Sequence, residues 1–252
     1  MAFPKLNIIK RPNKHIVSFS GGKDSTALLL MMIEKGMRID SIINIDTTKE
    51  FPGMYKHIED VKKFISPYKI TTVKIDYDYW FADYILVRGV RKGRIGYGWP
   101  SFRFRWCTGM KMDAFRSTAS NGVYLPRDRN QRSLRLIKDT IIYIGYSTSE
   151  INRTKDNTKR EKYPLIDWEI SGKQALQYCY GKGFDWSGLY EDFSRVSCTC
   201  CPFFRVKELR TMYKKYPELW LQLKEMDKKA LNKFRSDYSV DELDDKFKRE
   251  AM

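Results

Sequence analysis

Six residues, Ser20-Gly21-Gly22-Lys23-Asp24-Ser25, lie between two apolar segments and constrain the fold more than any other feature of the chain. The apolar segment before them, residues 15–19, is stopped by the two glycines and is predicted to be a short strand. The segment after them, residues 25–36, is rich in Leu and Met, and Gly36 suits a helix end. The pattern therefore predicts a strand, a tight turn and a helix.

Further apolar segments extend this alternation along the chain. Residues 39–45, 70–75 and 140–145 are predicted to be buried strands. Residues 52–66 carry apolar side chains three and four positions apart, which is the spacing of a helix. Strands that alternate with helices indicate an α/β fold, a mostly parallel sheet of about five strands flanked by helices.

The ends of these strands are where chemistry is expected. Ligands of such sheets bind at the carboxyl ends of the strands. Three segments follow predicted strands, at residues 20–25, 46–50 and 145–153. A fourth segment, residues 88–105, is rich in glycine, arginine and aromatic residues and is predicted to be a loop over the site.

The six-residue run has the composition of an anion site. Its glycines allow tight turns, and the amides at a helix start face a bound anion. Lys23 adds a mobile positive charge, Ser20 and Ser25 add hydroxyl groups, and Asp24 could hold Mg²⁺. A tight turn without any ligand is the simpler alternative, which the complete run with correct flanks disfavours.

The charge balance favours polyanionic or phosphorylated ligands. The chain has 252 residues with 47 Lys and Arg against 31 Asp and Glu, a formal net charge of +16. Such a charge attracts nucleic acids and phosphates at long range, although a solvated basic surface without a partner is an alternative. No segment has the length of a transmembrane helix, and residues 1–14 lack an apolar signal-peptide run, so a cytoplasmic protein is expected.

The cysteines cluster in a way that indicates metal or sulfur chemistry. Cys198 and Cys201 have a spacing that lets both thiolates reach one metal, and Cys107 and Cys200 are further candidate ligands. A [4Fe-4S] cluster, a structural zinc, a persulfide on Cys200 or Cys201, and inert thiols all remain open. Cys179 lies in an apolar helical pattern and is predicted to be a core residue, with a role as the fourth ligand in place of Cys200 as the alternative.

Several motifs together resemble one family. The six-residue run resembles the PP-loop of adenine-nucleotide α-hydrolases rather than a Walker loop. The motifs that follow are similar to those of the phosphoadenosine phosphosulfate (PAPS) reductase family. They are residues 46–52, with Thr48 where that family usually has glycine, residues 98–100, 105–108 with Lys111, 145–153, 163–168 and 198–203. Their order along residues 14–205 makes the resemblance specific.

The resemblance implies roles for individual residues. It implies that Ser20, Gly21, Gly22, Lys23, Asp24 and Ser25 hold phosphate or sulfate, with Asp46 and Gly145 beside the nucleotide and Arg105, Lys111 and Arg153 facing its anionic end. Lys23, Asp24 and Lys111 would be the catalytic residues, although Asp46 could instead cap a turn. The implied cofactors are ATP (or PAPS), Mg²⁺ and a [4Fe-4S] cluster or zinc on Cys107, Cys198, Cys200 and Cys201.

One departure from the family decides which activity we expect. The resembled reductases use a cysteine near their C-terminus, and this chain has no cysteine after Cys201. We therefore expect an ATP-dependent enzyme that adenylates a nucleic acid and transfers sulfur to it, as in tRNA thiolation or DNA phosphorothioation. PAPS or adenosine phosphosulfate reduction is the alternative, and a nucleotide-binding or nucleic-acid-binding protein without turnover is the second alternative.

The organisation and partners follow from the same resemblance. We expect a PP-loop domain over residues 1–205 and a helical extension over residues 206–252 packed on it, with an apolar stripe of Leu219, Leu223, Met226 and Leu231. The expected partners are an adenine nucleotide, tRNA or DNA, and a sulfur-donor protein such as a cysteine desulfurase. No membrane partner is expected, and the oligomeric state is left open.

Overall fold

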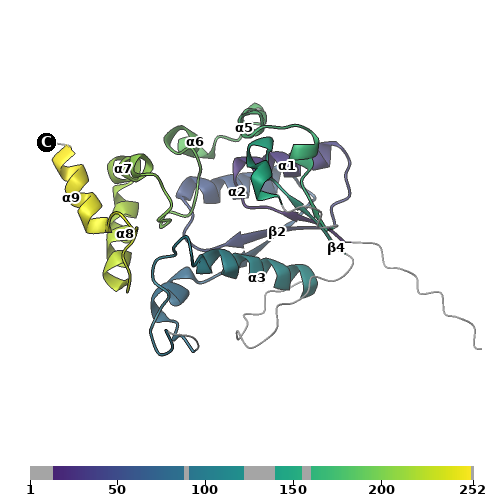
Figure 1. Cartoon of the computed structure of the whole chain (residues 1–252). Helices are drawn as coiled ribbons and strands as arrows, with labels where there is room; N and C mark the ends of the chain where they lie inside the picture. The colour runs from purple at the N-terminus through teal and green to yellow at the C-terminus, as the bar shows by residue number, and fades with distance from the viewer. Residues whose placement is uncertain (1–13, 88–90, 122–139, 155–159, 251–252) are drawn as a thin grey trace, which may run out of the picture.

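The computed structural model describes residues 14–87, 91–121, 140–154 and 160–250 (Figure 1). Its centre is a five-stranded sheet in the order β3-β2-β1-β4-β5, and every neighbouring pair is parallel. The strands are β1 (Lys14–Ser18), β2 (Ser41–Asp46), β3 (Ile70–Lys74), β4 (Thr140–Ile144) and β5 (Glu161–Lys162). The predicted α/β fold and its four predicted strands are thus confirmed, and β5 is an additional, very short strand.

Alternate side chains of the strands are buried on opposite faces of the sheet. Ile16 pairs in register with Ile142, and both pack with Phe115 on the face covered by α3. Val17 pairs with Ile42, and both belong to the larger core on the other face. Burial on both faces explains why β2 and β4 are rich in isoleucine, whereas the edge strand β3 exposes Thr71 and Thr72.

Two layers of helices cover the sheet. Figure 1 shows α1, α2 and α5 over one face and α3 over the other. The helices of this domain are α1 (Lys23–Glu34), α2 (Pro52–Phe64), α3 (Trp106–Asn121), α4 (Pro164–Asp167), α5 (Gly172–Gly181) and α6 (Leu189–Asp192). The predicted helices at residues 25–36 and 52–66 correspond to α1 and α2. Among the described residues of the segment 88–105, no helix forms.

Three helices form the C-terminal part of the chain. They are α7 (Val206–Lys215), α8 (Pro217–Lys229) and α9 (Val240–Glu250). Trp99 ties this part to the rest, because its Nε1 donates to Asp227 Oδ1 at 2.6 Å and its ring lies 4.8 Å from that of Phe234. One apolar cluster extends from Val17 to Phe247 through both parts. A division after residue 205 remains our proposal.

The predicted apolar stripe in this part is correct only in part. Leu223 and Met226 of α8 are buried and Leu219 is partly buried. Leu231 is 61% exposed, because α8 ends at Lys229 and the stripe ends with it. No helix in the described ranges is long and apolar enough to cross a membrane.

Candidate active site

The carboxyl ends of β1 and β4 form the centre of the candidate site. From β1 the chain crosses through α1 to β2 on one side, whereas β4 pairs with β1 on the other side. Such a reversal of strand order opens a crevice where ligands bind. Gly145 follows β4 and touches the loop after β1, since a Cβ atom built on it would lie 2.8 Å from the backbone of Asp24. Two of the predicted site segments are therefore in direct contact.

The loop between β1 and α1 has its backbone shaped for an anion. Gly21 has a φ of +78°, which favours glycine, and Gly22 precedes α1 without any side-chain cap. Ser25 Oγ accepts from the Ser20 amide at 3.2 Å and donates to the Gly22 carbonyl at 3.0 Å, which fixes the turn. In the described part of the chain, the amides of Asp24 and Ser25 have no acceptor. A helix start with free amides is an anion site.

Lys23 and Asp24 form an ion pair at this loop. Lys23 Nζ lies 2.8 and 2.7 Å from the two carboxylate oxygens of Asp24, and both side chains are mostly buried. Burial raises the pKa of Asp24, and the Lys23 charge opposes that shift. The Lys23 amide donates to the hydroxyl of Tyr190 in α6 at 2.8 Å, a contact that the sequence did not predict. The charge of Lys23 is thus held beside the loop, close to the free amides.

An apolar cavity of about 160 Å³ lies beside the loop, between the sheet and α3. Its walls come from the ends of β1, β2 and β4 and from the facing side of α3. It is lined by Ser18, Phe19, Ser20, Ile43, Ile45, Glu50, Lys111, Met112, Phe115, Arg116, Ile142, Ile144 and Glu161. Apolar walls with a few polar groups are typical of a site for a small organic ligand.

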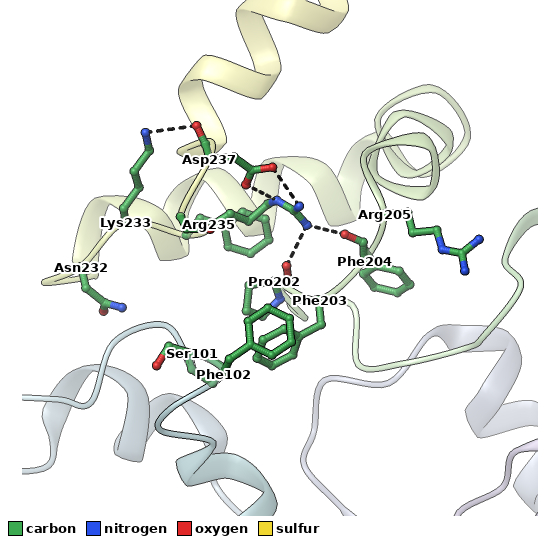
Figure 2. Close-up of a pocket in the computed structure, with 13 residues that line it drawn as sticks. Ser101, Phe102, Pro202, Phe203, Phe204, Arg205, Asn232, Lys233, Arg235 and Asp237 are labelled. Atoms are coloured by element: carbon green, nitrogen blue, oxygen red, sulfur yellow. Dashed lines mark hydrogen bonds and ion pairs between the residues drawn. The ribbon is translucent and has the colours of Figure 1, made fainter. Parts of the chain in front are cut away.

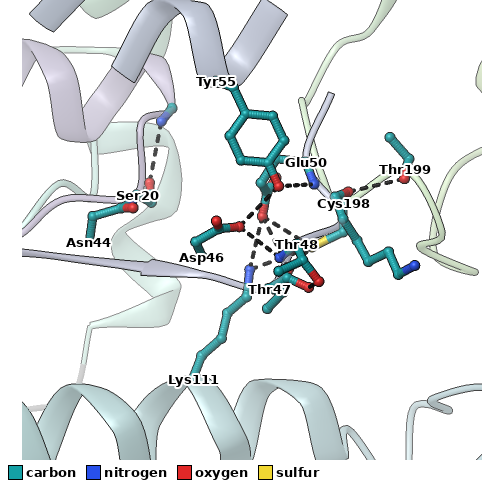
Figure 3. A network of polar contacts seen from close by, with 12 residues as sticks. Ser20, Asn44, Asp46, Thr47, Thr48, Glu50, Tyr55, Lys111, Cys198 and Thr199 are labelled. Carbon is teal, nitrogen blue, oxygen red and sulfur yellow. Dashed lines mark hydrogen bonds and ion pairs between the residues drawn. The ribbon is translucent and has the colours of Figure 1, made fainter. Parts of the chain in front are cut away.

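Asp46, at the end of β2, has its carboxylate engaged within its own turn. Asp46 Oδ1 accepts from the Thr48 amide at 2.7 Å and from the Tyr55 hydroxyl at 3.0 Å (Figure 3). Burial and the Asp46 carboxylate raise the pKa of Tyr55. These contacts match the turn-capping alternative, and Asp46 does not line the cavity. Thr48 has a φ of 61°, which explains why the resembled family usually has glycine at this position.

A polar group lies at the far end of the cavity and includes one residue that the sequence analysis did not single out. Glu50 Oε1 lies 3.4 Å from Lys111 Nζ and 3.4 Å from Cys198 Sγ, while Lys111 Nζ and Cys198 Sγ are 3.5 Å apart (Figure 3). Burial lowers the pKa of Lys111, but Cys198 and Glu50 raise it by more. Burial and Glu50 raise the pKa of Cys198 to about 12, with Lys111 opposing. Glu50 lies in the motif at residues 46–52, and this motif is the sequence feature that could have identified it.

The predicted metal ligands lie on facing segments. Cys107 is at the start of α3, and the other three are in one turn, where the Cys201 amide donates to the Cys198 carbonyl at 3.0 Å. Burial raises the pKa of Cys107, Cys200 and Cys201, and Cys200 also hydrogen-bonds with the Tyr77 hydroxyl.

The thiols fit a metal or a cluster in their chemistry, since soft thiolates are the ligands that iron–sulfur clusters and zinc take. Their present geometry does not form a site. Among the described residues, no group of three Cys, His, Asp or Glu side chains is arranged to hold a metal ion. Binding would require these side chains to turn toward one another.

Cys179 belongs to a different place, as predicted. It is fully buried in α5, and its thiol donates to the Lys23 carbonyl at 3.5 Å. Burial and the nearby Asp24 raise its pKa to about 12. Cys179 therefore supports the phosphate loop from within the core.

The two predicted arginines do not line the cavity. Arg153 forms an ion pair with Glu150 and lies 4.5 Å from the ring centroid of Tyr146. Arg105 lies over the rings of Phe102 and Phe203, at 5.4 and 4.6 Å from their centroids. Contact of either side chain with a nucleotide stays a prediction.

Comparison with known proteins is decisive for the family. The model of the phosphoadenosine phosphosulfate reductase domain matches residues 14–204. The chain belongs to this family. The matched region begins at the first residue of β1 and ends just before α7.

Individual relatives are more distant. "Uncharacterized protein MJ0066" of Methanocaldococcus jannaschii is 27% identical over 226 residues, which cover 84% of this chain and 40% of that protein. The chain thus spans about 40% of the length of this curated relative. The solved U34-tRNA thiolase NcsA from Methanococcus maripaludis, with its [4Fe-4S] cluster, is similar with a TM-score of 0.39 and 12% identity over 88% of this chain and 72% of that chain. A likeness at this TM-score says nothing about the ligands of the present chain.

Proposed function

We propose that this chain binds ATP with Mg²⁺, adenylates a nucleic acid and supports the transfer of sulfur to the activated position, as in tRNA thiolation or DNA phosphorothioation. The observation that carries the proposal is the cavity that runs from Ser20 of the phosphate loop to Glu50 and Lys111, with Cys198 directly beyond. One ligand in this cavity would contact both the phosphate loop and the cysteine segment.

The binding step rests on the loop and the cavity. The phosphates would lie on the free amides at the start of α1, and the adenine ring would enter the apolar cavity. Mg²⁺ would be held by the phosphates and by Asp24, which must then release Lys23 to the phosphates. The net charge of +16 favours a nucleic acid as the acceptor.

The chemistry is balanced when hydrosulfide is the sulfur substrate. An oxygen of the acceptor attacks the α-phosphorus, and pyrophosphate leaves with the bonding electron pair. Lys23 and the loop amides stabilise the negative charge that develops on the pyrophosphate, the kind of preorganised interaction that is often the largest catalytic contribution. Hydrosulfide then adds to the activated centre, and AMP leaves with the oxygen. The sum is ATP, acceptor hydroxyl and hydrosulfide giving AMP, pyrophosphate and acceptor thiol.

The cysteines would serve the second step. Cys107, Cys198, Cys200 and Cys201 are the thiols that would hold a [4Fe-4S] cluster, and ligation by three of them would leave one iron able to take up hydrosulfide. Glu50 and Lys111 would position the acceptor beside this segment and supply the acid and base at its reacting oxygen. A sulfur-donor protein such as a cysteine desulfurase would deliver the sulfur as a persulfide, and a thiol reductant would supply the two electrons that release it as hydrosulfide.

The test is pyrophosphate release from ATP by anaerobically purified protein, with and without total tRNA or DNA, followed by detection of sulfur in the nucleic acid. Lys23→Ala should abolish release, whereas the matched Lys69→Ala, at an exposed position before β3, should retain it. Sulfite release from PAPS or adenosine phosphosulfate with a thiol reductant would instead establish the reductase alternative. Tight nucleotide or nucleic-acid binding without either product would establish the non-catalytic alternative.

A further inference from the structure

A second pocket, of about 430 Å³, lies outside the nucleotide cavity (Figure 2). Three segments form it: the loop before α3, the turn after Cys201 and the connection between α8 and α9. It is lined by Pro100, Ser101, Phe102, Pro202, Phe203, Phe204, Arg205, Asn232, Lys233, Phe234, Arg235, Ser236 and Asp237. Nothing in the proposed reaction above uses this pocket.

The pocket is held open by hydrogen bonds between its walls. Asn232 accepts from the Trp99 amide and donates to the Trp99 carbonyl, both at 2.9 Å. The Arg235 guanidinium donates to the carbonyls of Pro202, at 3.0 Å, and Phe204, and it is paired with Asp237 (Figure 2). The three segments are thus tied together before any ligand arrives, which reduces the cost of ordering on binding.

Its mouth carries an aromatic platform, which we define as Phe102, Phe203 and Arg105. The two rings are 4.8 Å apart, and the Arg105 guanidinium lies over both. Phe102 is 78% exposed although its ring contacts that of Phe203, at an interplanar angle of 53°. Exposed aromatic rings beside arginine are the elements on which unpaired bases stack.

The charge around the platform matches a phosphate backbone. The segment 101–105 contributes Arg103 and Arg105, and the segment 202–207 contributes Arg205 and Lys207, whereas neither segment contains a carboxylate. Asp237, which lines the pocket from the third segment, is ion-paired with Arg235. The platform is also close in sequence to the candidate metal-binding cysteines. Arg105 is two residues before Cys107, and Phe203 is two residues after Cys201.

We propose that this pocket and its platform bind an unpaired nucleotide of a single-stranded nucleic acid, with the base stacked on Phe102 and Phe203 and the flanking phosphates at the arginines. The inference rests on the proposed nucleic-acid acceptor and specifies how its strand is held beside the cysteine segment. A duplex would not fit this mode, since its bases are already stacked on one another.

The test is fluorescence anisotropy of labelled oligonucleotides, single-stranded RNA, single-stranded DNA and the matching duplexes, with the full chain. Phe102→Ala should weaken single-strand binding by about 5- to 100-fold, the range found for the loss of one stacked base. Phe102→Tyr, which keeps an aromatic ring at this position, should bind the single strand with the affinity of the wild type. The matched control Leu221→Ala removes another exposed apolar side chain, which is 61% exposed on α8, and should bind like the wild type.

The charge is tested in the same assay. Arg105→Gln should weaken single-strand binding and lower the slope of its salt dependence by about one. Arg38→Gln, just before β2 at the opposite end of the sheet, should change neither the affinity nor the slope. Circular dichroism would verify the fold of each variant. The preferred strand, RNA or DNA, identifies the source of the acceptor.

The outcomes separate this proposal from the enzymatic one. Wild-type affinity in folded Phe102→Ala, or equal loss on duplexes, would overturn the platform and leave the ATP reaction intact. A wild type that binds no nucleic acid would overturn both. Loss of single-strand binding in the variants of a protein that releases no pyrophosphate would support the platform and refute the reaction.

Discussion

The Sγ atom of Cys198 lies 3.5 Å from the Nζ atom of Lys111, although 87 positions separate the two residues in the sequence. The contact joins α3 to the turn that contains three of the cysteines, and Glu50 completes it from the segment after β2. A cation, a carboxylate and a thiol therefore meet beside the cavity between the sheet and α3.

Lys111→Gln should lower turnover much more than nucleotide affinity. Its charge lies at the reacting end of the cavity, so its loss should cost about 10²- to 10³-fold in rate, the range for one preorganised donor. The measurement is the rate of pyrophosphate release together with the dissociation constant for ATP. Asp113→Asn, two residues along the same helix and exposed, is the matched control and should not change the rate. An unchanged rate in Lys111→Gln would remove Lys111 from the reaction.

Cys198→Ser should remove iron from anaerobically purified protein, if the thiols hold a cluster as proposed. Cys179→Ser should keep it, because Cys179 is buried in α5 beside the Lys23 carbonyl and away from the other four thiols. The measurement is iron and sulfide per chain with an absorption spectrum of the same sample. Full iron content in Cys198→Ser would refute Cys198 as a ligand.

Gly145→Ala should destabilise the protein by about 1–3 kcal/mol, the usual effect of overpacking. The added methyl would lie 2.8 Å from the Asp24 backbone and push the phosphate loop away from β4. ATP affinity should fall together with the free energy of unfolding, both measured by thermal or urea unfolding with and without ATP. Gly109→Ala is the control: it lies in α3 with no atom near its added Cβ, and it should stabilise by about 0.5–1 kcal/mol.

Thr48→Gly should increase stability by about 1 kcal/mol. Thr48 has a φ of 61°, which costs a β-branched residue on the order of 1–3 kcal/mol, and glycine relieves this strain at a smaller entropic cost. Urea unfolding measures the change. Thr72→Gly in β3, where the backbone is extended, should instead lower stability. A loss of stability in Thr48→Gly would show that the bond from its hydroxyl to the Thr47 carbonyl outweighs the strain.

The stability of the protein should decrease as the pH falls below about 6.5, because of His57. Burial lowers the pKa of His57 to about 4, so the unfolded chain takes up a proton that the folded protein excludes. The contribution of neutral His57 to the free energy of unfolding is present in full above about pH 6.5. It is lost as the pH falls toward 4, by at most about 3 kcal/mol. The free energy of unfolding between pH 7 and 4 measures it.

His57→Gln is the comparison for that measurement. His57 stacks on Trp186 at 4.2 Å and contacts Thr26 Oγ1 at 3.0 Å, so the variant will be less stable at every pH. Only its pH dependence should be flatter than that of the wild type. Parallel curves for the two proteins would assign the acid sensitivity to other groups.

The sequence by itself determined the α/β fold and the place of the glycine-containing turn between β1 and α1. Short apolar runs bounded by glycine and polar residues favour strands buried on both faces, and residues 20–25 place two glycines directly before a helix, the pattern of an anion-binding turn. These are local properties, so a single segment of chain contains all the information. The burial of Cys179 followed from the same kind of local pattern.

Only the tertiary structure decided which distant residues meet. The contact of Glu50, Lys111 and Cys198, the engagement of Asp46 in its own turn and the stacking of Arg105 on Phe102 and Phe203 all depend on how segments pack across the sheet. Side-chain directions at the ends of strands and helices are set by these neighbours rather than by spacing along the chain. That is why the sequence identified Lys111 and Cys198 separately, and why their contact required the fold.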